Sequence, residues 1–253
     1  MRFLLTNDDG IRATGLAALE RAVHGLGDIR VVAPDRERSG AGHSLTLDHP
    51  LRVATIDATH HAVSGTPTDA VLLAVEKLLP DRPDWVLSGI NHGPNMGEDV
   101  TYSGTVAAAI EATILGIPAI AISVAGRDNL QFEPLQPLVR SLVETLLQFP
   151  LGRNRLLNVN LPNLPPAAIR GVRVTRLGSR QYIDSVVEQQ DPRGRSYYWV
   201  GGTGPEWAED GHSDASAVQQ GFVSVTPLLV DLTDYRALVE LEAFVESWQS
   251  RPM

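Results

Sequence analysis

The sequence predicts an α/β fold: a doubly wound, mainly parallel sheet followed by a C-terminal β-hairpin extension and a terminal helix. Over about residues 1–162, short apolar runs of strand length alternate with segments whose apolar residues recur at helical spacing. Over about residues 163–253, strand-like alternation of apolar and polar residues takes over, and helical spacing returns at the end. We expect one domain over 1–253, in which the first part is the core and the second adds hairpins and a helix.

The chain opens with a predicted strand-helix-strand unit. Residues 3–5 form an apolar run that ends in the polar cluster 6–10. Apolar residues then recur at helical spacing, and a second apolar run over 29–33 is closed by Pro34. Such a unit places its two strands side by side and parallel, with the helix on one face of the sheet.

The same alternation continues along the first part of the chain. It predicts helices over 68–79, 103–115 and 135–147, and strands over 85–88, 119–122 and 156–160. After Pro162 we expect hairpins that include 172–176 and 197–200, a loop over 201–214 and a strand over 222–225. Helical spacing of apolar residues near the end predicts a closing helix that includes Trp248.

Composition excludes several classes of protein. The chain has 253 residues, 43% of them hydrophobic, which is enough for a sizeable core. Lys and Arg number 21 against 30 Asp and Glu, a net charge of −9, so binding to a nucleic-acid polymer or to an anionic membrane is not expected. The chain contains no cysteine, which excludes disulfides and cysteine-bound zinc. With neither a secretion signal nor a membrane-length apolar stretch, a soluble cytoplasmic protein is expected.

The cluster Asn7-Asp8-Asp9-Gly10 directly follows the first predicted strand. Ligands of open α/β sheets bind at the carboxyl ends of strands, so polar residues there are candidates for a site. Two adjacent carboxylates in a cleft repel each other unless a cation lies between them, and a bend at Gly10 would let both reach one ion. The sequence therefore indicates a divalent-metal site at Asp8 and Asp9. The alternative is a solvated turn.

Two further segments follow predicted strands. In the loop 35–44, Ser39 offers a neutral oxygen to a metal, and the backbone at Gly40 can approach an anion closely. The alternative is an ordinary surface loop. In 88–105, Asn91 and Asn95 precede a helix start at Ser103-Gly104-Thr105, whose free N–H groups and hydroxyls suit a phosphate. Here the alternatives are that Ser103 only caps its helix and that the asparagines stabilise turns.

These segments and several others together carry a family resemblance. They are Thr6-Asn7-Asp8-Asp9-Gly10, Val32-Ala33-Pro34-Asp35 with Arg38-Ser39-Gly40, Gly65-Thr66-Pro67-Thr68-Asp69, Ser88-Gly89-Ile90-Asn91 with Gly93-Pro94-Asn95, Ser103-Gly104-Thr105-Val106, Leu157-Asn158-Val159-Asn160-Leu161-Pro162, Gln190-Asp191-Pro192-Arg193-Gly194 and Gly221-Phe222-Val223-Ser224-Val225-Thr226-Pro227-Leu228. In this order and spacing the chain resembles the SurE family of survival-protein nucleotidases. Departures are His92, at a position that varies in the family, and 212–215, a looser match.

The resemblance implies a Rossmann-like enzyme that removes phosphate from nucleoside monophosphates. A 5′-nucleotidase is expected, with 3′-nucleotidase and exopolyphosphatase activities as further possibilities. The resemblance also implies one divalent ion per subunit (Mg²⁺, Mn²⁺ or Ca²⁺), a homodimer or homotetramer, and roles for particular residues. The metal ligands would be Asp8, Asp9, Ser39 and Asn91, of which Asp8 and Asp9 would be catalytic. The phosphate-binding residues would be Gly40, Asn95, Ser103, Gly104 and Thr105.

Other classes of protein fit less well. An aspartyl-phosphate phosphatase needs Asp-x-Asp, and the second acid would fall on Gly10. The chain has neither a Gly-x-Gly-x-x-Gly fingerprint after its first strand nor a phosphate-binding Gly-x-x-x-x-Gly-Lys-Ser/Thr loop. A nucleotide-binding sensor without turnover remains an alternative. For catalysis, the hypothesis is direct attack by a metal-activated water, and the alternative is attack by Asp8 itself.

Overall fold

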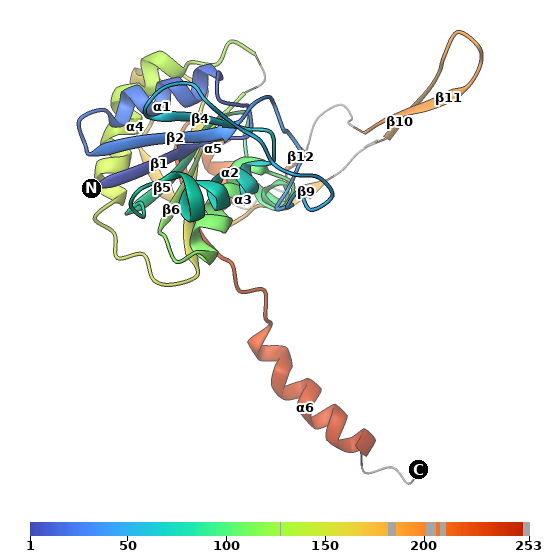
Figure 1. Ribbon diagram of the computed structural model, residues 1–253. Helices are drawn as coiled ribbons and strands as arrows, with labels where there is room; N and C mark the ends of the chain where they lie inside the picture. The colour runs from blue at the N-terminus through green and yellow to red at the C-terminus, as the bar shows by residue number, and fades with distance from the viewer. Residues whose placement is uncertain (127, 182–185, 201–205, 208–210, 250–253) are drawn as a thin grey trace.

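The computed structural model describes residues 1–126, 128–181, 186–200, 206–207 and 211–249. One large sheet runs through the centre of the molecule (Figure 1). Its strands are β1 (Arg2–Thr6), β2 (Asp28–Pro34), β3 (Val53–Thr55), β4 (His60–Val63), β5 (Trp85–His92), β6 (Ala119–Ala125), β7 (Arg155–Pro162), β8 (Val172–Val174) and β13 (Val223–Leu229). Across the described sheet the order is β3-β4-β2-β1-β5-β6-β7-β13-β8.

The sheet is mainly parallel, as the sequence predicts. Neighbouring strands from β4 through β2, β1, β5 and β6 to β7 are all parallel. Antiparallel pairs occur only toward the two ends of the described sheet, where β3 pairs with β4 and β13 pairs with β7. The carboxyl ends of β1, β2, β5 and β6 therefore meet along one edge, where a ligand site is expected in this architecture.

Helices cover both faces of the sheet, so its strands alternate between two apolar cores. On one face, α1 (Thr14–Val23) and α4 (Phe132–Leu146) pack against Phe3 and Leu5. On the other, α2 (Pro67–Leu73) and α3 (Gly104–Ile114) pack against Leu4. This arrangement confirms the doubly wound α/β prediction. The helix expected over 68–79 divides into α2 and a π-helical segment η1 (Ala74–Leu78).

Two elements project from the body (Figure 1). The hairpin of β10 (Val186–Gln190) and β11 (Ser196–Val200), here called the arm, is antiparallel, as expected. The helix α6 (Tyr235–Gln249) confirms the predicted closing helix. At the base of the arm, β9 (Arg180–Gln181) pairs with β12 (Glu206–Trp207). The Trp248 side chain lies outside what the structure describes.

Some elements differ from the prediction. The strands β3 and β4 were not predicted, because they are only three and four residues long and lack a continuous apolar run. The segment expected to form a hairpin over 172–176 instead supplies β8, which pairs in parallel with β13 in the main sheet. A short helix α5 (Asp214–Gln219) begins where a loop was expected to end, and short 3-10 turns form η2 (Gly97–Thr101) and η3 (Pro166–Ala168).

Among the described residues, every helix is too short or too polar to span a lipid bilayer.

Candidate metal and phosphate site

The bend after β1 is built by Asn7. Its side-chain amide donates to the carbonyl oxygen of Gly10 (3.1 Å), and the N–H of Gly10 donates back to Asn7 Oδ1 (3.2 Å). Gly10 has a φ of 100°, and a Cβ there would lie 3.0 Å from the carbonyl carbon of Arg36. The bend predicted at Gly10 is therefore present. The role of Asn7 was missed, although an asparagine two or three residues before a glycine is a known turn signal.

Asp8 lies against the N-terminus of α3. Only 5% of its surface is exposed, and the hydroxyl of Thr105 donates to its Oδ1. Burial raises the pKa of Asp8 above its ordinary value, and hydrogen bonds from the Thr105 hydroxyl and from backbone N–H groups, including that of Gly104, oppose this rise. A Cβ at Gly104 would lie 2.7 Å from the Asp8 Cβ, so a glycine is required for this close approach.

Asp9 is less buried than Asp8 and is held from the other side, by β5. The backbone N–H of His92 donates to Asp9 Oδ2 at 3.2 Å. Burial and the neighbouring Asp8 carboxylate raise the pKa of Asp9 to about 6, which His92 partly offsets. The structure therefore brings the two carboxylates together in one cleft. Their repulsion is the electrostatic cost that a bound cation would remove.

Asn91 lies near the end of β5, on the strand next to β1. Its amide nitrogen donates to the carbonyl oxygen of Gly93 at 2.8 Å. With the nitrogen committed in this way, the side chain presents its oxygen as the atom available to a metal, which is the hard, neutral donor that the sequence suggested.

Asn95 is buried and fixed mainly through its backbone. Its N–H donates to Asn160 Oδ1 (2.8 Å), and its carbonyl oxygen accepts from Asn158 (2.7 Å) and Asn160 (2.9 Å). Its amide nitrogen donates to Ser123 at 2.8 Å. The two asparagines of β7 were not predicted as site residues. Their signal is polar side chains at alternate positions of an otherwise apolar strand.

The loop after β2 is attached to the first strand's end through Arg38. The N–H of Arg38 donates to the backbone carbonyl oxygen of Asp8 at 2.7 Å. The next residue, Ser39, is exposed, and its hydroxyl donates to Glu37 at 2.8 Å. Gly40 follows with a φ of 73° and open space where a Cβ would lie. The structure thus places Ser39 and Gly40 next to a residue bonded to Asp8. Their assigned roles stay predictions.

Ser103 caps α3: its Oγ accepts the N–H of Val106 at 3.1 Å. Ser103 therefore caps the helix, and its assigned role in binding phosphate stays a prediction. A capping hydroxyl keeps its own proton, so the same oxygen can still donate to an anion. The Thr105 hydroxyl, in contrast, is engaged with Asp8.

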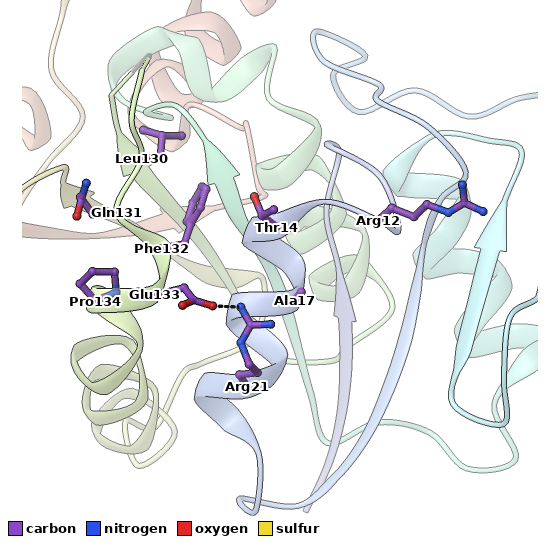
Figure 2. Close-up of a pocket in the computed structure, with 9 residues that line it drawn as sticks. All are labelled: Arg12, Thr14, Ala17, Arg21, Leu130, Gln131, Phe132, Glu133 and Pro134. Carbon is purple, nitrogen blue, oxygen red and sulfur yellow. Dashed lines mark hydrogen bonds and ion pairs between the residues drawn. The ribbon is translucent and has the colours of Figure 1, made fainter.

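A cavity of about 630 Å³ flanks the site on the α1 side (Figure 2). The ion pair between Arg21 and Glu133 (3.0 Å) crosses it from α1 to the first turn of α4. Two lining residues contact His92: the Thr14 hydroxyl lies 3.4 Å from its ring nitrogen, and the Phe132 ring centroid lies 4.8 Å from that of His92. Since the His92 N–H binds Asp9, the cavity adjoins the acidic pair.

The donor set of the site suits a hard cation. Among the described residues, no three His, Cys, Asp or Glu side chains are grouped as a metal site, so a cation at Asp8 and Asp9 would need neutral oxygens as well. Carboxylate, amide and hydroxyl oxygens are what Mg²⁺, Mn²⁺ and Ca²⁺ prefer. The fold and the site thus define an α/β protein with an acidic, oxygen-lined cleft at the carboxyl edge of a parallel sheet, beside a helix N-terminus.

Comparison with known proteins places this chain in a family. The family model "Survival protein SurE" matches residues 3–184, and the chain belongs to the SurE family. A 5′-nucleotidase SurE of Gemmatimonas aurantiaca is 53% identical over 98% of this chain and 99% of that protein. A 5′-nucleotidase SurE of Vibrio cholerae is 49% identical over 97% and 98%. The crystal structure of the SurE protein from Aquifex aeolicus superposes with a TM-score of 0.87, at 44% identity over 96% of this chain and 99% of that one.

Proposed function

We propose that this chain is a metal-dependent 5′-nucleotidase, a phosphomonoesterase that converts nucleoside monophosphates to nucleoside and phosphate. The observation that carries the proposal is the pair Asp8 and Asp9 in one cleft, with the N-terminus of α3 directed at Asp8. Full-length relatives named 5′-nucleotidase SurE, about half identical to this chain, support it. Nucleoside 3′-monophosphates and short polyphosphate are further proposed substrates of the same site.

The proposed cofactor is one divalent ion per subunit, Mg²⁺, Mn²⁺ or Ca²⁺, held by Asp8, Asp9, Ser39 and Asn91. The raised pKa of Asp9 supports this assignment, because it reflects burial of the carboxylate and, second, repulsion by Asp8, and a bound cation would offset both. When bound, such an ion neutralises charge on phosphoryl oxygens and lowers the pKa of water. Ser39 would have to leave Glu37 to serve as a ligand, a small rotation for an exposed side chain.

The proposed phosphate pocket consists of Gly40, Asn95, Ser103, Gly104 and Thr105. A helix N-terminus offers free N–H groups and a positive dipole end to an anion. Ser103 can donate its hydroxyl proton while still capping the helix. Thr105 would act through Asp8, since its hydroxyl fixes one carboxylate oxygen and so orients the other.

For the chemical step we propose direct attack of water on phosphorus. Asp8 is a poor nucleophile here, because it is buried and its Oδ1 already accepts a hydrogen bond from Thr105. Asp9, with a pKa of about 6, is the better candidate to orient the water or accept its proton. Hydrolysis of a substrate chiral at phosphorus should therefore invert its configuration. Retention would identify two successive displacements and make Asp8 the nucleophile.

Assembly into a homodimer or homotetramer is also proposed, through the arm and α6. On the arm, Tyr198 and Trp199 are 62% and 63% exposed, and on α6 Phe244 is 66% exposed. Exposed aromatic side chains on elements that leave the body are typical of surfaces that pack against another chain. The expected cytoplasmic location stays a prediction, as does the division of the single domain near residue 162.

Phosphate release from AMP, measured with and without a chelator, tests the proposed function. A nucleotidase should release phosphate with Mg²⁺ or Mn²⁺, stop in excess EDTA and recover when the metal is restored. A sensor would bind AMP without turnover under every condition. Undiminished turnover by a protein shown to be free of metal would refute the metal dependence.

A further inference from the structure

Asp214 is a carboxylate with no exposed surface that lies outside the proposed metal and phosphate ligands. It begins α5, directly after the capping residue Ser213. Burial raises the pKa of Asp214, and backbone N–H groups that bind the carboxylate oppose the rise. A buried carboxylate is stable only when N–H or O–H groups donate hydrogen bonds to it, so the donors to Asp214 indicate its structural role.

The carboxylate joins three segments of the chain. Its Oδ2 accepts the N–H of Gly97 at 2.9 Å, and its Oδ1 accepts the N–H groups of Gly178 and Ala215, each at 2.8 Å. The bond to Ala215 lies within α5. The other two come from distant places: Gly97 lies in the loop between Asn91 and Ser103, and Gly178 lies just before β9.

The contact at Gly97 is close. This residue has a φ of 53°, and a Cβ there would lie 2.7 Å from the Trp207 ring and 2.9 Å from the Gly178 carbonyl oxygen. The loop is therefore pressed against the base of the arm, where β9 and β12 pair. Only a glycine combines this backbone conformation with this approach.

The segment 178–180 also binds Glu98 and Asp99, the two residues that follow Gly97. The backbone N–H of Arg180 donates to Glu98 Oε2 at 2.7 Å, and its guanidinium lies 2.5 Å from both carboxylate oxygens of Asp99. Three successive loop residues are thus held by Asp214 and by the segment 178–180.

The loop held in this way carries the proposed phosphate pocket. Asn95 lies two residues before Gly97, and Ser103, the cap of α3, lies six residues after it. On the Asn95 side the backbone is anchored by Asn158 and Asn160. On the Gly97 side it is anchored by Asp214. Between these anchors the chain has little freedom, which is what a site that must place donors around a phosphoryl group requires.

We propose that Asp214 is a positioning residue for the phosphate pocket: by binding the Gly97 N–H, it fixes the loop that carries Asn95 and leads into Ser103. Its carboxylate binds the N–H groups of Gly97, Gly178 and Ala215, so it acts through the loop. The proposal rests on the proposed function, because it concerns the same pocket.

Asp214→Asn tests it, because an amide has only one acceptor oxygen. If that oxygen stays with Gly178 and Ala215, the NH₂ group faces the Gly97 N–H, and the loop loses its anchor. With saturating Mg²⁺, the Kd for inorganic phosphate and the KM for AMP should each rise about tenfold, as expected for displaced positioning groups. The affinity for Mn²⁺, measured by calorimetry, should change less than about twofold, because Asp8 and Asp9 are untouched.

Ser213→Ala is the matched control. In the wild type, Ser213 Oγ accepts the Ser216 N–H at 3.2 Å and so caps α5. The substitution removes this cap and leaves the contact between Asp214 and Gly97 in place. It should lower the melting temperature without changing the Kd for phosphate. The proposal is overturned if Asp214→Asn leaves the phosphate Kd and the KM within about twofold of the wild type, or if Ser213→Ala raises them equally.

Arg180→Met covers the case in which Asp214→Asn does not fold. It removes the ion pair between Arg180 and Asp99 and so loosens the same loop, and the Kd for phosphate should again rise. An unchanged Kd would show that loosening this loop does not weaken phosphate binding, which would overturn the premise that the loop must be held for the pocket to form. Turnover and binding are separate readouts: a wild type that binds phosphate but does not hydrolyse AMP refutes the proposed nucleotidase activity, while the phosphate Kd of the variants still decides the role of Asp214.

Discussion

Asp8 and Asp9 are adjacent in sequence, yet the fold gives them different surroundings. Asp8 faces the N-terminus of α3 and receives a hydroxyl from Thr105, whereas Asp9 faces the end of β5 and receives the N–H of His92. The sequence could predict that two carboxylates follow the first strand. It could not predict which neighbour each would have, because both partners come from segments more than 80 residues away.

Replacing either carboxylate by its amide should weaken metal binding. We expect Asp8→Asn and Asp9→Asn each to raise the Kd for Mn²⁺ by at least about tenfold, since the loss of even an outer partner of a metal ligand has effects of that size. Circular dichroism should show an intact fold. Asp35→Asn, which removes an exposed charge after β2, is the control and should bind Mn²⁺ like the wild type. A variant at Asp8 or Asp9 that keeps the wild-type Kd would show that the ligand assignment is wrong.

The raised pKa of Asp9 predicts how stability depends on pH in the absence of metal. Folded Asp9 keeps its proton up to about pH 6, whereas the unfolded chain loses it near 3.8. Between these values the folded state binds more protons, so the free energy of unfolding should fall as pH rises from about 4 to about 6 and then level off.

Urea unfolding of the wild type and of Asp9→Asn in chelator, at several pH values, measures this effect. The wild type should lose on the order of 1–2 kcal/mol relative to the variant across the window, after allowance for solvent screening. Added Mn²⁺ should abolish or reverse this fall in the wild type, because a bound cation lowers the pKa of Asp9. Parallel pH curves for the two proteins without metal would contradict the assigned cause.

Among the helices and strands, α3 lies at the centre of the proposed site, because its first residues contact Asp8. Its first residues approach Asp8 so closely that Gly104 cannot be replaced without a clash, and Ser103 caps the helix. The sequence predicted the helix and its polar start. It left open whether the hydroxyls serve the helix or a ligand. The structure shows that the Ser103 hydroxyl caps the helix. It also shows that the Thr105 hydroxyl donates to Asp8, a contact that sequence spacing does not predict.

Thr105→Val isolates this contact, because valine keeps the shape of the side chain and removes only the hydroxyl. We expect the inhibition constant for inorganic phosphate to rise several-fold, since an Asp8 without its hydrogen bond is less well oriented beside the pocket. Thr113→Val is the matched control: its hydroxyl donates to the Ala109 carbonyl oxygen in the same helix, away from the site. If both variants lose stability alike and inhibition by phosphate is unchanged, the Thr105 hydroxyl is structural only.

Strands with continuous apolar runs were predicted well, because a parallel strand buried on both faces consists almost wholly of apolar residues. This applies to β1, β2, β5 and β6, and β7 was predicted although Asn158 and Asn160 interrupt its apolar residues. The strands β3 and β4 were missed because they have only three and four residues and no continuous apolar run, and α5 was missed because six residues carry too little periodicity. For the same reason the buried donors and acceptors Asn158, Asn160 and Asp214 were not recognised: tertiary contacts, not local pattern, give them their roles.

At the scale of the molecule, the arm and α6 extend from an otherwise compact body (Figure 1). Light scattering should therefore find a dimer or tetramer, and Trp199→Glu on the arm should lower the measured mass by adding a charge to an apolar contact. Ile56→Glu, at an exposed position outside both elements, serves as the control. A wild type that is a fully active monomer at nanomolar concentration would contradict the proposed assembly.

The position of β13 in the sheet affects how the chain folds during its synthesis. This strand, residues 223–229, lies between β7 and β8, and its register with β7 runs from Ser224–Asn160 to Leu229–Arg155. During synthesis, about 60 residues must follow β7 before its partner leaves the ribosome, a delay of several seconds at ordinary translation rates. Until then β7 is an open strand edge on a nearly finished core, and such edges pair readily with other chains. Nascent or truncated chains that end before residue 223 should accordingly depend on chaperones, whereas the complete chain closes this edge itself.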